Sequence, residues 1–247
     1  MRIESLNIWG GREKEPLLKH VREQAPQTSV FCFQEVFNGQ PAHDRDVVPN
    51  IYNEIVAALP DHVGYYAPAH GPEGLATFVR RDVCVKGGGS TVVHRWNLDP
   101  SREIDQDRVL QFLTIVLDGR DITVANIHAL QLGPDKGDTL ERLAQFQRAK
   151  AEVVKGPTVL CGDFNVRPYT NSLLVFEEDT DPRRRLRNLV TANGIPTTRS
   201  PHYPYRDTEP FADYIFVSPP PSISCVKFMV LEDVVVSDHL PLVVEIE

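Results

Sequence analysis

The chain has 247 residues and a formal net charge of −8, with 41% hydrophobic and 24% charged residues. This composition is ordinary for a soluble globular protein. No stretch approaches the ~20 apolar residues needed to cross a bilayer, and the first residues lack the apolar segment of a secretory signal, so we expect a cytoplasmic protein. The acidic balance argues against a wide basic face for duplex DNA. It leaves phosphate substrates open, because carboxylates clustered at a metal site add negative charge.

Neither an internal repeat nor a composition break divides the chain, so we expect one domain spanning residues 1–247 and favour a monomer. Four cysteines are widely spaced in strand-like apolar contexts, without a C-x-x-C pair: Cys32, Cys84, Cys161 and Cys225. Such spacing favours reduced thiols that serve as small core residues.

Apolar runs with period-two alternation predict strands, taken here in chain order, at 3–9, 29–36, 64–69, 75–81, 109–117, 122–130, 157–162, 212–218, 223–231 and 240–247. The fifth and sixth flank Asp118-Gly119-Arg120-Asp121, a hairpin turn with glycine where positive φ is needed. Helical periodicity covers 15–25, 49–59, 138–154 and 183–193. In the third, Asp138-Thr139 can cap a stripe of Leu140, Leu143, Phe146 and Ala149. Mixed hairpins and helices predict an α/β protein with mixed sheets and outer helices.

The basic run at 181–188 has two explanations. A solvated helix face is the plainer one, and contact with an anionic substrate is the alternative.

Polar side chains follow several of the strands, at the point where each should leave the core. Asp163 and Asn165 end the run at 157–162, and if strand geometry persists, their side chains point to the same side. Asn126 and His128 repeat this i, i+2 spacing at the end of the second hairpin strand. Other predicted strand ends carry Asn7, Glu35, Asp213, and Asp238 with His239. Any one of them is explained by turn chemistry. Together they predict a shared site at one rim of the sheets.

The residue types in this set restrict the chemistry. The chain contains neither a G-x-S-x-G elbow nor a phosphate-binding loop of the Walker type. Oxygen-rich ligands favour Mg²⁺ or Mn²⁺ over zinc. A hard dication beside a carboxylate that activates water points to attack on phosphorus.

The ordered set resembles the endonuclease/exonuclease/phosphatase superfamily, the deoxyribonuclease I-like metal-dependent phosphoesterases. The matching motifs are Asn7, Gln34-Glu35, Asn126-x-His128, Gly162-Asp163-x-Asn165, Asp213 before Tyr214-Ile215-Phe216, and Ser237-Asp238-His239. The resemblance implies a four-layer sandwich, two packed mixed β-sheets flanked by helices, with the site at one edge. Ile127 and Ala129 around His128 depart mildly from the superfamily pattern, which often has Thr and Leu there.

The resemblance also implies roles for the site residues. Glu35 would be the main Mg²⁺ (or Mn²⁺) ligand, with Asn7 nearby and Asp238 supporting the metal region. Asp163 would orient and deprotonate the attacking water, and Asn165 would hold the phosphoryl group. His239 would bind a phosphate oxygen while Asp213 accepts its other N–H. Asn126 and His128 would contact the phosphate from the other side.

Two loops could carry substrate specificity. Residues 94–108 combine Trp96 with Arg95, Arg102 and Arg108, which could stack a base or cover a sugar phosphate; the alternative is that Trp96 anchors the loop. Residues 199–207 combine His202, Tyr203, Tyr205 and Arg206, with tyrosine packing as the alternative.

Three functions follow from these observations. The leading one is a metal-dependent phosphodiesterase acting by in-line attack of water on nucleic-acid ends or single strands. The second is a hydrolase of small phosphoesters, such as nucleotides, sugar or inositol phosphates, or a lipid headgroup. The third is a catalytically silent binding module, against which the presence of Glu35, Asp163 and His239 argues.

Overall fold

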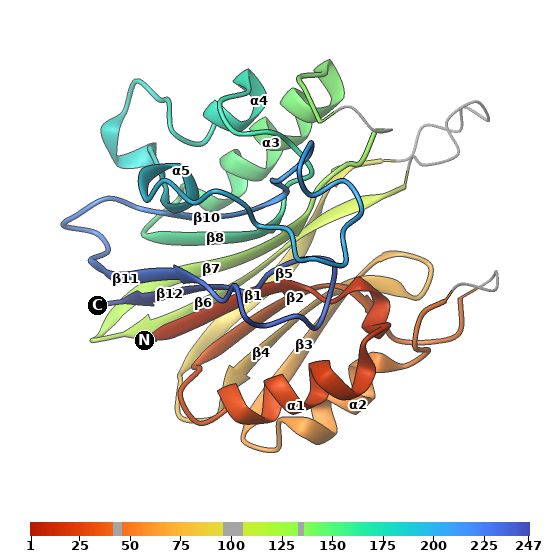
Figure 1. The fold of residues 1–247 in the computed structure, drawn as a ribbon. Helices are drawn as coiled ribbons and strands as arrows, with labels where there is room; N and C mark the ends of the chain where they lie inside the picture. The colour runs from red at the N-terminus through yellow and green to blue at the C-terminus, as the bar shows by residue number, and fades with distance from the viewer. Residues whose placement is uncertain (42–45, 96–105, 133–135) are drawn as a thin grey trace.

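The computed structural model describes residues 1–41, 46–95, 106–132 and 136–247. Two six-stranded mixed sheets pack face to face (Figure 1). In order across the first sheet, the strands are β11 (Cys225–Val230), β12 (Leu242–Ile246), β1 (Arg2–Asn7), β2 (Val30–Phe37), β4 (Glu73–Arg80) and β3 (His62–His70). Across the second sheet they are β5 (Val85–His94), β6 (Arg108–Leu117), β7 (Arg120–His128), β8 (Thr158–Asp163), β10 (Asp213–Val217) and β9 (Arg187–Asn188).

Helices cover the two outer faces (Figure 1). α1 (Lys14–Gln24) and α2 (Ile51–Ala58) lie on the first sheet, and α3 (Leu140–Val153), α4 (Asn171–Leu174) and α5 (Leu189–Ala192) lie on the second. The four layers confirm the architecture expected from the sequence.

Each sheet has one parallel pair of strands near its centre. β1 pairs with β2, so that Asn7 lies opposite Gln34, and β7 pairs with β8, so that His128 lies opposite Asp163. β10 runs antiparallel to β8 and begins at Asp213, directly opposite Asp163. Because parallel strands end at the same edge of a sheet, these pairings bring the polar strand ends together.

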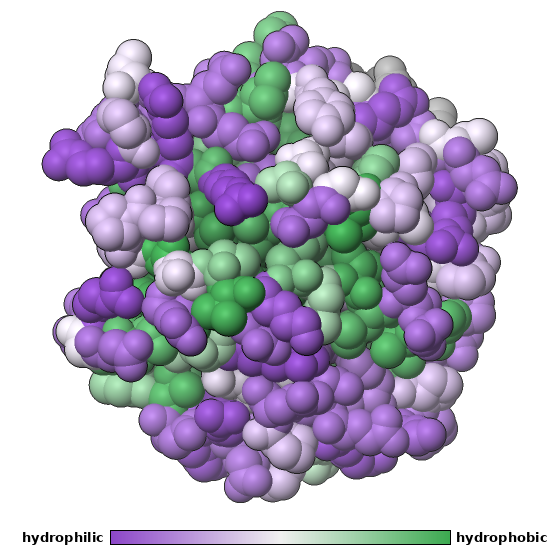
Figure 2. All heavy atoms as spheres, turned by 60° about the vertical axis from the view of Figure 1, so that its left-hand side comes forward, coloured by the Kyte–Doolittle hydropathy of each residue, from purple (hydrophilic) through white to green (hydrophobic). Residues whose placement is uncertain are grey.

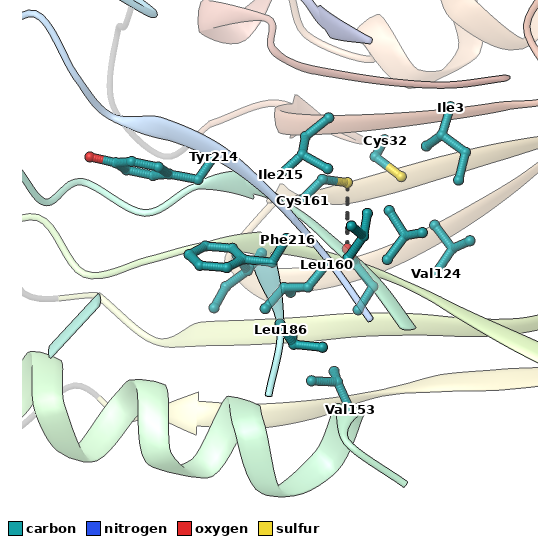
Figure 3. Packing of buried hydrophobic residues seen from close by; sticks show 14 of the residues in the cluster. Ile3, Cys32, Val124, Val153, Leu160, Cys161, Leu186, Tyr214, Ile215 and Phe216 are labelled. Carbon is teal, nitrogen blue, oxygen red and sulfur yellow. Dashed lines mark hydrogen bonds between the residues drawn. The ribbon is translucent and has the colours of Figure 1, made fainter. Parts of the chain in front are cut away.

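The core is built from apolar side chains of both sheets (Figure 3). Cys32 and Cys161 are buried there, and the Cys161 thiol donates to the carbonyl of Ala125 at 3.5 Å. All four cysteines are free, as expected, but Cys84 is exposed and Cys225 only partly buried, so the expectation of four core thiols is wrong for Cys84.

Buried amides also join the two sheets. Gln34 donates to the side chain of Asn126 at 2.7 Å, and Asn126 donates to the carbonyl of Phe33 at 3.0 Å. Farther along, the Thr77 hydroxyl donates to Gln111 at 2.7 Å. These directional contacts set how the sheets lie on one another, which apolar packing alone specifies less sharply.

Three local expectations were wrong. The expected helix at 183–193 is replaced by a 3-10 turn (Pro182–Arg184), β9 and α5, because Asn188 pairs with Phe216 of β10 and its side chain then caps α5. The sequence pattern missed β5, whose three consecutive glycines suppress the strand signal although it pairs along β6. Leu140, assigned to the buried stripe of α3, is 83% exposed.

Two expectations about turns and caps were confirmed. Asp118 and Gly119 both have positive φ, which makes the two-residue hairpin turn between β6 and β7. The Thr139 hydroxyl accepts from the backbone N–H of Arg142 and caps α3.

Figure 2 brings forward the left-hand side of Figure 1; hydrophobic residues gather at the centre of this face, within a hydrophilic surround. Among the residues described, no helix combines the length and the apolar character that a membrane crossing requires.

Candidate active site

Irregular backbone conformations orient two acidic side chains of the site, Glu35 and Asp163. In β2 the register against β4 shifts between Phe33 and Val36, and Glu35 within this bulge has a φ of 55°. A bulge re-aims a side chain relative to a regular strand. As a result Glu35 faces the end of the sandwich, with 28% of its side chain exposed.

Asp163 is positioned by the glycine before it. Gly162 has a φ of 139°, and a Cβ there would overlap the backbone of Ile127 in the neighbouring strand. The close approach of β7 and β8 therefore requires glycine at this position. β8 ends at Asp163, so the condition that strand geometry continues to Asn165 is not met. Asn165 instead turns back with a φ of 50°, and its backbone N–H donates to the Asp163 carboxylate at 2.9 Å.

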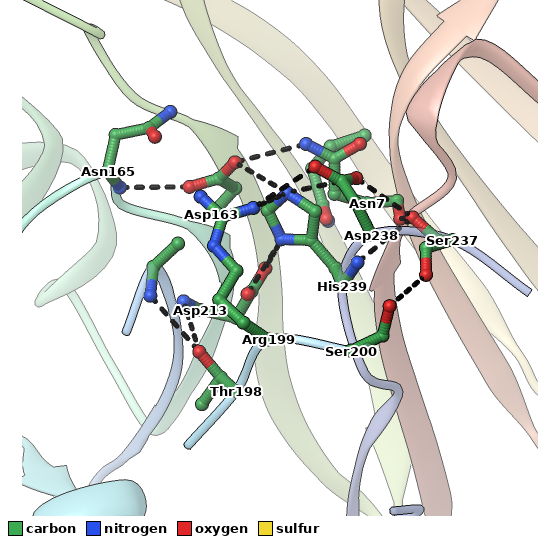
Figure 4. A network of polar contacts seen from close by, with 12 residues as sticks. Asn7, Asp163, Asn165, Thr198, Arg199, Ser200, Asp213, Ser237, Asp238 and His239 are labelled. Carbon is green, nitrogen blue, oxygen red and sulfur yellow. Dashed lines mark hydrogen bonds and ion pairs between the residues drawn. The ribbon is translucent and has the colours of Figure 1, made fainter. Parts of the chain in front are cut away.

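Asn7 links the two acids across the sheets (Figure 4). Its amide nitrogen donates to Glu35 and to Asp163, at 3.0 Å in each case. The amide oxygen accepts from the backbone N–H of Trp9 at 3.0 Å. The Ser237 hydroxyl donates to the carbonyl of Asn7 at 2.6 Å. Residues far apart in the chain thus share one hydrogen-bonded centre, as the sequence predicted.

His239 forms the second part of the centre. Its Nδ1 lies 2.8 Å from a carboxylate oxygen of Asp213, and its Nε2 lies 3.7 Å from Asp163. An Arg199 guanidinium N–H contacts the same Nε2. Asp213 is fixed in turn, because its backbone N–H donates to the Thr198 hydroxyl at 3.2 Å. The geometry holds the ring with Nδ1–H toward Asp213 and Nε2 toward Asp163 and Arg199.

His128 lies on the other side of Asp163, 3.7 Å from its carboxylate and 3.9 Å from Glu35. Its Nδ1 accepts from Arg108 at 3.1 Å. Burial, followed by the charge of Arg108, holds the pKa of His128 well below its usual range. His128 is therefore neutral at neutral pH, and its Nε2–H faces the two acids.

Two further buried cations lie next to Asn165 and His239. The Lys136 ammonium donates to the Asn165 amide oxygen at 3.4 Å, and Arg199 also lies 3.5 Å from Asp238. Both cations approach the ring of Tyr203, Arg199 at 4.1 Å and Lys136 at 5.6 Å from its centroid.

The pKa shifts follow from this charge arrangement. Burial raises the pKa of Glu35 to about 7, with added repulsion from Glu73 and Asp238. Burial acts in the same direction on Asp163, but the neighbouring cations, led by His239, outweigh it and hold its pKa below the usual range. Asp163 is thus the carboxylate that stays ionised, as a proton acceptor beside a reacting centre requires.

Burial and Arg199 oppose protonation of His239, but the carboxylates of Asp213, Asp238 and Asp163 outweigh them and raise its pKa. Nearby carboxylates thus favour an imidazolium, which can offer Nε2–H to an anion once the Arg199 N–H no longer contacts Nε2.

The acids around Glu35 fit a hard divalent cation. Glu35 and Asp238 offer carboxylate oxygens, with the Asn7 amide beside Glu35. Burial, followed by the charges of Glu73 and Asp238, raises the pKa of Glu35, and a dication would offset that negative charge. In the described ranges, ligand atoms of Asp163, Asp213 and His239 also lie within 4.8 Å of one another. We do not assign the metal to that trio, because Asp213 already accepts from His239 Nδ1.

The structure brings most of the residues predicted for the site together: Asn7, Glu35, His128, Asp163, Asn165, Asp213, Asp238 and His239. Asn126 differs from the expectation of phosphate contact, since both ends of its amide are engaged between the sheets.

The predicted substrate loops are only partly connected to this centre. Tyr203 lies at the site, whereas Tyr205 is 64% exposed and packs edge-on against Tyr203. The backbone N–H of Arg206 donates to Tyr203, and Arg95 is exposed. Trp96 and Arg102 lie outside the described residues.

Sequence reasoning missed three charged residues of the site, Glu73, Lys136 and Arg199, and it missed the contact of Arg108 with His128. Glu73 and Arg108 each begin a strand, so their position at a strand end was a usable signal. Lys136 and Arg199 lie in loops, and no spacing in the sequence marks them.

The family model of the endonuclease/exonuclease/phosphatase family matches residues 5–239. The chain belongs to this family. Its members are phosphoester hydrolases, and the strand-end residues described above fall within the matched range.

Solved structures show the same fold. The endonuclease/exonuclease/phosphatase from Bacteroides vulgatus has a TM-score of 0.75 at 15% identity, covering 100% of this chain and 98% of that one. A mannosyl-6-phosphatase from Bacteroides thetaiotaomicron has a TM-score of 0.73 at 19% identity, with coverage of 100% and 99%. The human nocturnin catalytic domain with a bound sulfate anion has a TM-score of 0.69 at 20% identity, with coverage of 100% and 93%. The comparison with curated proteins found no match.

Proposed function

We propose that this family member is a divalent-metal-dependent phosphoester hydrolase that works by in-line attack of water on phosphorus. One observation carries the proposal: Asn7 hydrogen-bonds both Glu35 and Asp163, and Asp163 lies 3.7 Å from both His128 and His239. An ionised carboxylate, a carboxylate for a metal with its amide partner and two imidazoles surround one small space.

Each residue has a task that follows from its contacts. Asp163 accepts the proton of the attacking water and holds that water in line with the leaving oxygen. Nε2–H of His239, fixed by Asp213, donates to a non-bridging phosphate oxygen, and the Asn165 amide binds the same group. His128 donates from the opposite side of Asp163. Asn126 supports the site by fixing the two sheets.

Glu35 and Asp238 would hold Mg²⁺ or Mn²⁺, with Asn7 positioning Glu35; the cation when bound offsets the negative charge that builds up on phosphorus. Glu35 keeps part of its carboxylate exposed, so a cation from solvent can reach it.

Two substrate classes are compatible with this chemistry. The first is phosphodiesters of nucleic acid, gripped locally at ends or in single strands because a net charge of −8 disfavours extended duplex contact. The second is small phosphoesters, favoured by the buried Lys136 and Arg199 beside Asn165 and His239.

The test is hydrolysis by the purified protein with Mg²⁺ or Mn²⁺, with and without chelator. The substrates are p-nitrophenyl esters, single- and double-stranded DNA, RNA, inositol phosphates and sphingomyelin. Turnover abolished by chelator and by Asp163→Asn is the expected result. No turnover of any phosphoester by the wild type would refute the proposal and favour a binding module.

A further inference from the structure

Lys136 is a buried cation without a counter-ion among the described residues. It is 2% exposed, and the only hydrogen bond of its ammonium group in the described part of the chain is the 3.4 Å contact to the Asn165 amide oxygen. No carboxylate of the described residues lies within ion-pair distance of its ammonium group. A buried ammonium without a partner is costly, so its position calls for an anion that joins it.

Arg199 extends this positive region. Its side chain is buried, its Nε has no hydrogen-bond partner in the described ranges, and its only carboxylate within ion-pair distance there is Asp238 at 3.5 Å. Tyr203 lies against both cations, 4.1 Å from Arg199 and 5.6 Å from Lys136. Figure 4 shows the Arg199 side chain directed toward His239 and Asp163. The two cations thus adjoin the residues assigned to the phosphoryl group.

The number of donors exceeds what a phosphodiester can use. A diester offers two non-bridging oxygens and one negative charge. His239, Asn165 and the cation bound near Glu35 already supply enough donors and positive charge for these. A terminal phosphate monoester offers a third oxygen and close to two charges at neutral pH. In a diester that third oxygen carries a carbon, which would face the Lys136 ammonium and leave it unpaired.

We infer that Lys136 and Arg199 bind the third oxygen of a terminal phosphate, so that the site selects phosphomonoesters over phosphodiesters. The inference rests on the proposed hydrolytic function and names its substrate class. On arrival of the phosphate, Arg199 exchanges its contact with His239 Nε2 for one with the anion. His239 Nε2 then also faces the phosphate. Burial, followed by Arg199, lowers the pKa of Lys136 to about 8, so the group is still charged at neutral pH.

The test compares two esters that differ by one methyl group, p-nitrophenyl phosphate and methyl p-nitrophenyl phosphate, which share a leaving group. The wild type should have the higher kcat/KM for the monoester. Lys136→Gln should lower the ratio of the two kcat/KM values about 10- to 100-fold, as expected for a lost hydrogen bond to a charged group. Lys136→Arg should restore most of the ratio. Lys155→Gln, the same change at an exposed lysine, is the matched control and should leave it unchanged.

Three outcomes would overturn the inference. An equal loss on both esters would show that Lys136 acts through Asp163 or Asn165 and not on the third oxygen. A wild type that prefers the methyl ester, or a ratio unchanged in Lys136→Gln, would also refute it. Thermal unfolding of each variant verifies that the kinetic change does not reflect misfolding.

A binding measurement separates this inference from the proposed function. Calorimetric titration with inorganic phosphate and with dimethyl phosphate, in the presence of Mg²⁺, should show phosphate binding that weakens about tenfold or more in Lys136→Gln. Phosphate binding through Lys136 without turnover of either ester would support the inference and refute hydrolysis. Turnover of the esters without any dependence of selectivity on Lys136 would support hydrolysis and refute the inference.

The terminal phosphate has two possible sources, and the substrates distinguish them. Release of inorganic phosphate from a 5′-phosphorylated oligonucleotide would assign the site to nucleic-acid ends. Release from a hexose phosphate or an inositol phosphate would assign it to small molecules. Both supply the group that Lys136 recognises.

Discussion

Replacing Gly162 with alanine tests how the strands position the active site. Its φ of 139° is rarely adopted by residues with a side chain, and the added Cβ would overlap the carbonyl oxygen of Ile127 and lie 2.9 Å from its carbonyl carbon. The overlap is with backbone, so β7 and β8 must separate. Backbone strain of ~1–2 kcal/mol and the loss of one or two strand hydrogen bonds, ~1 kcal/mol each, predict a destabilisation of ~2–4 kcal/mol.

Gly119→Ala is the matched control. Gly119 also has a positive φ, 77°, but apart from its chain neighbours no heavy atom of the described residues lies within 4 Å of the position a Cβ would take. Only the strain remains there, so we expect a destabilisation of ~1 kcal/mol.

Urea unfolding of the two variants and the wild type, followed by circular dichroism, measures both changes. The folded fraction of Gly162→Ala should also have a lower kcat, because His128 and Asp163 lie opposite one another across the displaced strands. Equal stability of the two alanine variants would refute the steric argument.

Three further predictions concern the site itself. Asp163→Asn should lower kcat about 10²–10⁴-fold on p-nitrophenyl esters without unfolding the protein, and wild-type activity would remove the proton-acceptor role. Mn²⁺ at 100 times its Kd should stabilise the wild type by about 2.7 kcal/mol. The thermal shift that measures this should shrink in Glu35→Gln, and an equal shift would place the metal elsewhere. The pKa of Lys136 is about 8 in the folded chain and 10.5 when exposed. Burying its charge therefore lowers the free energy of unfolding fully below pH 8, and this loss of stability decreases as the pH rises toward 10.5. Lys136→Met should therefore gain up to ~3 kcal/mol at pH 7 and much less at pH 10; urea midpoints at the two pH values give the difference, and a pH-independent gain would contradict the cause.

The strands and the acids of the site were predictable because they have short-range signals. Asn7, Glu35 and Asp163 each follow a run of residues suited to burial, and the order of the motifs indicated which strand ends meet. The hairpin turn at Asp118 and Gly119 was predictable for the same reason, because Asp-Gly is a typical sequence for such a turn.

Features set by tertiary contact were not predictable. β5 forms because β6 offers an edge, although its glycines disfavour a strand. The basic run before Asn188 resembles a helix, but pairing with β10 and capping by Asn188 replace it. Lys136 and Arg199 come from loops whose path depends on the whole fold, so only the structure shows them beside Asn165 and His239.

The interior bridge from Gln34 to Asn126 bears on how such an enzyme could be re-engineered. It ties the strands that carry Glu35 and His128 to one another inside the protein, independently of the loop at 199–207. Exchanging residues 202–207 for those of a relative would change which compound is accepted while keeping Arg199 and its contact with Asp238. Selectivity and turnover could then be altered one at a time in this scaffold.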